Sequence, residues 1–166
     1  MAEQTIGLTH PFAPIFDERS RVLVLGTFPS VKSRENAFYY GHPQNRFWRV
    51  LAGVLNEPAP STVADKTAML LRNRIALWDV LAGCDVTGSA DSAIKHPIPN
   101  DIAGLLGRTA IARVFANGKT AWALYARCCA ERTHMEATAL PSTSPANAAW
   151  SEARLIEAWR AILDIQ

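Results

Sequence analysis

The sequence predicts an α/β fold in which helices cover both faces of a mainly four-stranded parallel sheet. Two observations lead to this prediction. Short apolar runs of the kind that form buried strands alternate with longer stretches whose apolar residues recur at helical spacing. No segment of the chain repeats another. Such alternation indicates successive βαβ units, whose strands lie parallel and whose helices pack on the sheet.

Four apolar runs are predicted strands. Each is stopped or followed by glycine, asparagine or proline, the residues that most often end regular structure. The predicted strands are residues 21–25, 75–81, 111–116 and 137–140.

Five stretches between and after these runs are predicted helices. Ser61 is the expected N-cap of the second helix, and Asp101 lies in the turn that opens the third. The predicted helices are residues 47–55, 61–71, 99–106, 120–132 and 150–163.

Length and composition bound the class of protein. A chain of 166 residues can bury its own core, so we expect a single domain over residues 1–166. The net charge of +2 permits a nucleic-acid partner without requiring one. Neither an apolar run of about 18 residues nor a leader pattern is found, so we expect no membrane span and no secretory signal. The three cysteines, two of them adjacent, fit neither a disulfide framework nor a zinc site and indicate a reducing, cytoplasmic location.

Ligands of such folds bind beyond the carboxyl ends of the parallel strands. The loops that follow Leu25, Val80, Phe115 and Leu140 are therefore the candidate functional loops. Two predicted loops are long, at residues 26–46 and 83–100, and long loops in a compact domain are more often functional than connective.

The first long loop combines glycine, hydroxyl, aromatic and basic residues. Gly26 allows a tight turn and a close approach of the backbone, and Ser30 can bind a phosphate. Aromatic rings interleaved with cations suit stacking on a base together with neutralisation of a nucleic-acid backbone. The alternative is that the rings form a small core within the loop. The aromatic residues are Phe28, Phe38, Tyr39 and Tyr40, and the cations are Lys32, Arg34 and Arg46.

Two segments of the chain carry a resemblance to a known family. GTFPS at 26–30 and YYGHPQNRFW at 39–48 resemble the first motif of the uracil-DNA glycosylase superfamily, and are most similar to its hypoxanthine-DNA (deoxyinosine) glycosylase branch. Part of this motif also occurs in the mismatch-specific uracil/thymine branch. LPSTSPAN at 140–147 resembles the late loop that inserts into the duplex. The resemblance covers roughly residues 22–162.

The resemblance implies a three-layer α/β/α sandwich that forms one DNA glycosylase domain. It implies a monofunctional enzyme that flips a deaminated base, chiefly hypoxanthine, out of double-stranded DNA and hydrolyses its N-glycosidic bond. No metal or organic cofactor is expected, and we expect a monomer. The alternatives are a uracil/thymine mismatch-specific glycosylase and a non-catalytic module that binds nucleotides or DNA. Phe28 favours the latter, because well-known members place Asp or Asn there.

The resemblance assigns the catalytic role to Asn45, since the deoxyinosine branch places it on an asparagine in this part of the motif. An amide can accept a hydrogen bond from water and donate to the sugar or the base. The alternative for Asn45 is an N-cap before Arg46. His42 either contacts a phosphate or closes the turn with Pro43.

The predicted base-binding residues follow three of the four strands. Asp79 can accept from N1–H of hypoxanthine, a donor that adenine lacks, or it can bind backbone amides of the next loop. Asn117 lies beside the base or only forms a turn with Gly118. A P-loop is excluded there, because residue 113 is arginine rather than glycine. The full predicted set is Gly26, Thr27, Phe28, Tyr40, Asp79 and Asn117.

The last loop is predicted to hold the DNA around the lesion. Ser142 and Ser144 can bind flanking phosphates, and the segment Pro145, Ala146 and Asn147 can fill the gap left by the flipped nucleotide. The alternative is an ordinary connector that caps the last helix. The predicted set for the DNA backbone and intercalation is Ser30, His42, Ser142, Ser144, Pro145, Ala146 and Asn147.

Overall fold

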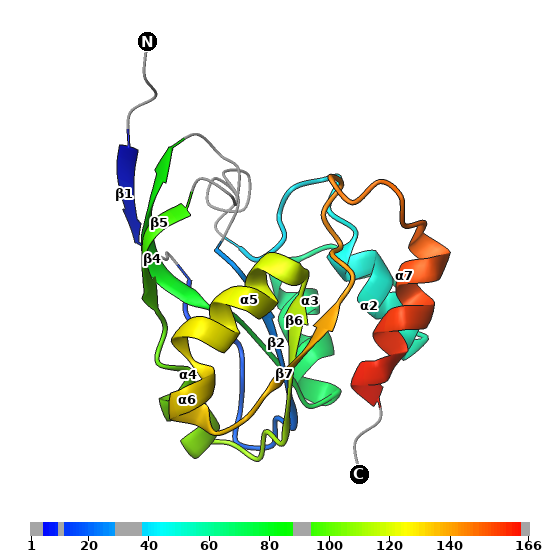
Figure 1. Ribbon diagram of the computed structural model, residues 1–166. Helices are drawn as coiled ribbons and strands as arrows, with labels where there is room; N and C mark the ends of the chain where they lie inside the picture. The colour runs from blue at the N-terminus through cyan, green and yellow to red at the C-terminus, as the bar shows by residue number, and fades with distance from the viewer. Residues whose placement is uncertain (1–4, 10–11, 29–37, 88–93, 164–166) are drawn as a thin grey trace.

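The computed structural model describes residues 5–9, 12–28, 38–87 and 94–163, with side chains described from residue 12 onward and not for 85–87 (Figure 1). The segment 29–37, which holds the predicted phosphate ligand Ser30 and the cations Lys32 and Arg34, lies outside the described residues.

Four parallel strands form the central sheet. They are β2 (Val22–Gly26), β3 (Ile75–Asp79), β6 (Arg113–Asn117) and β7 (Ala137–Leu140), in the order β3-β2-β6-β7. Each of the four coincides with a predicted strand to within two residues at either end. All five residues of β2 are buried, as expected of an apolar strand flanked on both edges and covered on both faces.

Helices cover both faces, so the structure confirms the three-layer sandwich. Val22 and Val24 face the layer made by α2 (Phe47–Leu55), α3 (Val63–Arg72), α7 (Glu152–Trp159) and the following 3₁₀ turn (Arg160–Leu163). Leu23 and Leu25 point the other way, toward α4 (Ile102–Gly107) and α5 (Lys119–Cys128). The alternation of side chains along β2 thus divides the core into two halves.

The helix ends correct two predictions. The N-cap of α3 is Thr62 rather than Ser61, because Thr62 Oγ1 accepts a hydrogen bond of 3.0 Å from the Asp65 amide. The predicted helix 120–132 is two helices, α5 and α6 (Ala130–Thr133), which meet at Cys129. Asp101 caps α4 and Ser151 caps α7, each by accepting from the backbone three residues onward.

The prediction of a long loop over residues 83–100 is wrong. β4 (Leu81–Thr87) and β5 (Ile94–Pro99) lie there and pair antiparallel, and β1 (Thr5–Thr9) pairs with the other edge of β4. Figure 1 shows this three-stranded sheet, β1-β4-β5, beside the central one. The two prolines of β5 disguise it as a loop in the sequence, although proline is compatible with an edge strand. The predicted strand 75–81 divides at Val80 between β3 and β4.

Within the described residues, we find no helix that is both long and apolar enough to span a membrane.

Candidate active site

The carboxyl ends of the four parallel strands bring the predicted site residues together. Gly26 lies opposite Asp79 in the register of β2 and β3, and Asn117 lies opposite Leu140 in that of β6 and β7. The segment before α2 and the loop after β7 meet over these ends, as Figure 1 shows at the top of the view. We call residues 141–147 the insertion loop. The site is therefore formed by one segment from the N-terminal part of the chain and another from its C-terminal part.

One corner of the site is built by close packing around Gly26. A Cβ at this position would lie 2.3 Å from Asp79 Oδ1 and 2.8 Å from the Tyr40 hydroxyl, so only glycine leaves room for both. The Asp79 side chain is buried. The strand ends are also joined by their backbones, because Val80 N donates to Gly26 O over 2.8 Å and Leu81 N donates to Thr27 O over 3.1 Å. Gly26, Thr27, Tyr40 and Asp79 thus lie together, as predicted.

Tyr40 has a left-handed backbone, with φ of 53°, and its ring stacks on Phe47 at a centroid distance of 4.2 Å. The neighbouring Tyr39 is buried and donates to Ala13 O over 2.9 Å. Burial, and to a smaller extent the Asp79 charge, raise the pKa of the Tyr39 phenol far above its ordinary value. Tyr39 is therefore a neutral donor at all working pH values.

The other described aromatic residues of this segment pack inside the protein. The Phe38 ring stacks on the Trp48 ring at a centroid distance of 6.0 Å, and it meets the Tyr39 ring edge-on at a centroid distance of 5.7 Å. Phe28 is half-buried and packs against the core on the α4–α5 side of the sheet. For Phe38 and Tyr39 the structure favours the small-core interpretation, whereas a stacking role for Phe28 and Tyr40 stays a prediction.

Asn45 occupies the opposite corner, at the start of α2. Its Oδ1 accepts from the Phe47 amide and from the Thr143 hydroxyl, each over 2.9 Å. The helix-capping contact, which was the alternative interpretation of Asn45, is thus present. The side chain is half-exposed, and its nitrogen Nδ2 forms no hydrogen bond among the described residues. Capping through one atom leaves the other atom for substrate, so the catalytic prediction stands beside the cap.

Thr143 joins Asn45 to Asn117, a connection that the sequence alone does not predict. The Thr143 side chain is fully buried. Its amide donates to Asn117 Oδ1 over 3.1 Å, and Asn117 Nδ2 donates to Thr143 Oγ1 over 3.0 Å. The only signal for this role in the sequence is the run of three hydroxyl residues at 142–144, whose members look alike until the fold buries one of them.

Arg46 holds the insertion loop in place. Its guanidinium donates to the backbone oxygens of Ser144 and Asn147 over 3.1 Å each, and to that of Trp150. Its own amide donates to Thr143 O over 3.1 Å. Arg46 therefore has a structural role in this loop, and the suggestion from sequence that it neutralises a DNA phosphate stays a prediction.

The hydroxyls of the insertion loop shape its turns. Ser142 Oγ accepts from the Ser144 amide over 3.1 Å, and Ser144 Oγ accepts from the Ala146 amide over 3.2 Å. Asn147 Nδ2 donates to Ser142 O over 3.0 Å. Pro145 and Ala146 are exposed at the tip, where a wedge would need them. In these bonds each serine uses its hydroxyl oxygen as an acceptor, so its hydroxyl hydrogen can still be donated to a phosphate. The predicted phosphate contacts stay predictions.

His42 closes the turn that precedes Asn45. Its Nδ1 accepts from the Gln44 amide over 3.0 Å, and its carbonyl accepts from the Asn45 amide over 3.0 Å. The turn-closing interpretation of His42 is confirmed. Nδ1 is an acceptor, so the hydrogen of the neutral ring lies on Nε2, and a phosphate contact through Nε2 stays a prediction.

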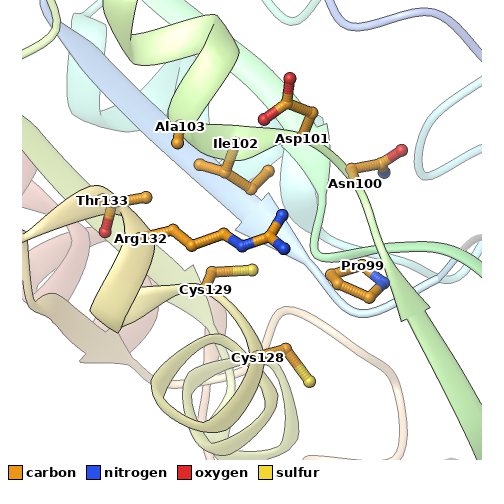
Figure 2. Close-up of a pocket in the computed structure, with 9 residues that line it drawn as sticks. All are labelled: Pro99, Asn100, Asp101, Ile102, Ala103, Cys128, Cys129, Arg132 and Thr133. Atoms are coloured by element: carbon orange, nitrogen blue, oxygen red, sulfur yellow. The ribbon is translucent and has the colours of Figure 1, made fainter.

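Two hollows lie near or beside this region. One of about 650 Å³ runs along the insertion loop between Lys119 and Trp150. The other, of about 80 Å³, lies between α4 and α6, where the Arg132 side chain extends between Ile102 and Cys129 (Figure 2). Burial raises the pKa of the Cys129 thiol to about 11. The smaller hollow holds only a few water molecules, so it is no candidate for the base pocket.

The described residues contain no group of three or more His, Cys, Asp or Glu side chains placed to hold a metal ion. The expectation that the enzyme needs neither metal nor cofactor stays a prediction.

Comparisons with known proteins show the family to which the chain belongs. A hypoxanthine DNA glycosylase of Methanosarcina acetivorans is 34% identical over 153 residues, which are 91% of this chain and 95% of that protein. One of Methanosarcina barkeri is 39% identical over 85 residues, 51% of this chain and 54% of its own. A solution NMR structure described as a candidate uracil DNA glycosylase of Methanosarcina acetivorans superposes with a TM-score of 0.79 at 31% identity, covering 95% of this chain and 99% of that one. The family model of the Uracil DNA glycosylase superfamily matches residues 13–163, and the chain belongs to that superfamily.

Proposed function

We propose that this enzyme is a monofunctional DNA glycosylase that removes hypoxanthine from deoxyinosine in double-stranded DNA. One observation carries the proposal: the hydrogen bond of 2.9 Å between Thr143 and Asn45 joins the first motif to the insertion loop across 98 positions of sequence. Residues for cleavage and residues for holding an opened duplex thus form one site. The relatives named as hypoxanthine DNA glycosylases support this substrate.

The Asp79 corner supports recognition of the base. Hypoxanthine presents N1–H, which an ionised carboxylate accepts, whereas adenine presents an acceptor at N1 and would face repulsion. Asp79 is buried at the end of β3, where water competes little for this contact. Uracil also presents a ring N–H, at N3, so a uracil/thymine mismatch-specific activity is the second candidate.

The reaction breaks the bond between C1′ and the base and forms a bond between C1′ and a water oxygen. Positive charge develops on the sugar and negative charge on the leaving base; the attacking water releases one proton to solvent, and the departing base takes up one proton from solvent. Asn45 is assigned to this step as the polar group beside the reacting bond. The exposed residues Pro145 and Ala146, with Asn147, are assigned to fill the space that the flipped nucleotide leaves.

A single-turnover cleavage assay tests the function. Matched duplexes carry deoxyinosine, deoxyuridine or deoxyxanthosine, and wild type is compared with Asn45→Ala. We expect deoxyinosine to be cut fastest and the Asn45→Ala rate to fall about hundredfold or more, as when a preorganised polar group is lost. Faster cleavage of deoxyuridine would support the second candidate. Tight binding of the lesion duplex without any abasic product would support the non-catalytic module.

We propose further that the enzyme acts as a monomer in the cytoplasm. Flipping engages one protein with one lesion, and the adjacent residues Cys128 and Cys129 are free thiols, which suits a reducing compartment. Light scattering at assay concentration checks the first point, and cell fractionation checks the second.

A further inference from the structure

We propose that Thr143 is a positioning residue that fixes the Asn45 amide with its oxygen held by protein, so that Asn45 serves the reaction as a hydrogen-bond donor rather than as an acceptor for water. This inference rests on the proposed glycosylase function and specifies the chemical role of the Asn45 amide in that reaction.

Two backbone amides determine the direction of every hydrogen bond in this corner. The Thr143 amide can only donate, so the Asn117 atom that it contacts at 3.1 Å is the oxygen. The other Asn117 atom is then the amide nitrogen, which donates to Thr143 Oγ1 over 3.0 Å. The Thr143 hydroxyl, having accepted there, places its single hydrogen toward Asn45 Oδ1 at 2.9 Å.

The Asn45 end of the chain is determined in the same way. The Phe47 amide can only donate, so its partner at 2.9 Å is Oδ1 of Asn45. Oδ1 has two lone pairs, and the Phe47 amide and the Thr143 hydroxyl occupy them both. Thr143 is fully buried, so water does not replace its hydroxyl. The substrate therefore meets Nδ2, which has two hydrogens and no lone pair to give.

A donor in this place stabilises negative charge. As the N-glycosidic bond lengthens, charge moves to the nitrogen and oxygen acceptors of the departing base, and a fixed N–H that faces them strengthens its hydrogen bond in the transition state. The same N–H can hold a water by its oxygen, but it cannot take up a proton from it. Asn45 thus assists departure of the base.

The variant Asn45→Asp separates a donor from an acceptor. One carboxylate oxygen keeps both protein contacts, and the second replaces Nδ2 by an acceptor. We expect the single-turnover rate on deoxyinosine at pH 8 to fall about hundredfold, and to rise as the pH is lowered, because a protonated carboxyl regains a donor. A variant that retains the wild-type rate, or whose rate rises with pH as a general base requires, would overturn the proposal.

Thr143→Val and Thr143→Ser test the positioning role. Valine keeps the shape and loses the hydroxyl, so we expect the maximal rate to fall about tenfold with little change in the half-saturating enzyme concentration. Serine keeps the hydroxyl and should restore most of the rate. Thr109→Val is the matched control, since it removes a hydroxyl that donates to Leu105 O over 3.1 Å at the opposite end of β6. Equal loss in the valine and serine variants would show a packing role only.

Nitrogen-15 NMR of the full chain gives a readout that needs no catalysis. The side-chain amide signals of Asn45 and Asn117 should both move in Thr143→Val and stay in place in Thr109→Val. Unmoved Asn45 signals would refute the hydrogen-bond chain even in an active enzyme. Moved signals in a protein that cuts none of the three lesions would preserve the geometry and reject the proposed function.

Discussion

The two corners of the active site are held in different ways. The Asn45 corner is a set of directed hydrogen bonds among neutral groups, in which each donor has one acceptor. The Gly26 corner is joined by backbone hydrogen bonds between strand ends and is closely packed, because the Asp79 carboxylate and the Tyr40 hydroxyl both lie where a side chain at residue 26 would be. One corner is therefore sensitive to the exchange of single polar atoms, and the other to added volume.

Gly26→Ala should have the largest effect. The added methyl group meets Asp79 Oδ1 at 2.3 Å and the Tyr40 hydroxyl at 2.8 Å, and both groups are confined. We expect a loss of about 1–3 kcal/mol in the free energy of unfolding, typical of overpacking, and a single-turnover rate below detection. Urea unfolding and the cleavage assay measure the two. Gly107→Ala is the control, since nothing lies within 4 Å of its added carbon.

Asp79→Asn changes the charge of the Gly26 corner while keeping its volume. The amide can turn its nitrogen or its oxygen to the base, so it loses the strict preference for a ring N–H. We expect deoxyinosine cleavage to fall about tenfold or more, and the ratio of deoxyadenosine to deoxyinosine cleavage to rise, because adenine presents an acceptor at N1. Asp65→Asn, on the exposed first turn of α3, should leave both rates unchanged. An unchanged ratio in Asp79→Asn would remove this carboxylate from base recognition.

Arg46→Lys weakens the contacts that hold the insertion loop next to Asn45. An ammonium cannot reach three carbonyls that a planar guanidinium spans. We expect the melting temperature to fall, with a loss of about 1–3 kcal/mol in stability, and binding of the lesion duplex to weaken. Arg49→Lys, at the exposed pair with Glu152, is the neighbouring control and should cost little. Unaltered binding in Arg46→Lys would mean that the loop keeps its shape without this clamp.

Ser144→Ala should have the smallest effect. It removes the acceptor for the Ala146 amide at the exposed tip, and with it one predicted phosphate contact. We expect the dissociation constant for the lesion duplex to rise by a factor of about three to ten, equally for all flanking sequences. Ser61→Ala, where the predicted cap is not formed, should leave binding and stability alone. A change that depends on sequence would contradict a backbone contact.

The parallel sheet was predictable because its information is local. β2, β3 and β6 are compact, largely buried runs with a clear stop, whereas β7, at the edge of the sheet, is shorter and more exposed and is located mainly by the proline that follows it. The antiparallel sheet was missed because β5 has no buried position and two prolines, so it lacks the apolar pattern of a strand, and because β1 pairs with β4 from about eighty positions away. The division between α5 and α6 was also missed, because no glycine or proline marks the break at Cys129.

The same difference between local patterns and distant contacts applies to the residues of the site. Asn45, Asp79 and Asn117 were identified because motif and strand-end positions point to them. Thr143 and Arg46 were missed in their structural roles, because their partners lie about a hundred positions away in the chain. A hydroxyl or a guanidinium near the site looks like a ligand for DNA until the fold shows which backbone groups it already satisfies.

The clamp formed by Arg46 has a consequence for how the enzyme searches DNA. The insertion loop is held in shape by the protein before any duplex arrives, so little conformational entropy is lost when it enters. Discrimination then depends on the duplex, since a weak pair opens more easily than a sound one. The rate of interrogation along undamaged DNA should follow the spontaneous opening of each pair, and hypoxanthine should be found fastest opposite the partner with which it pairs least stably.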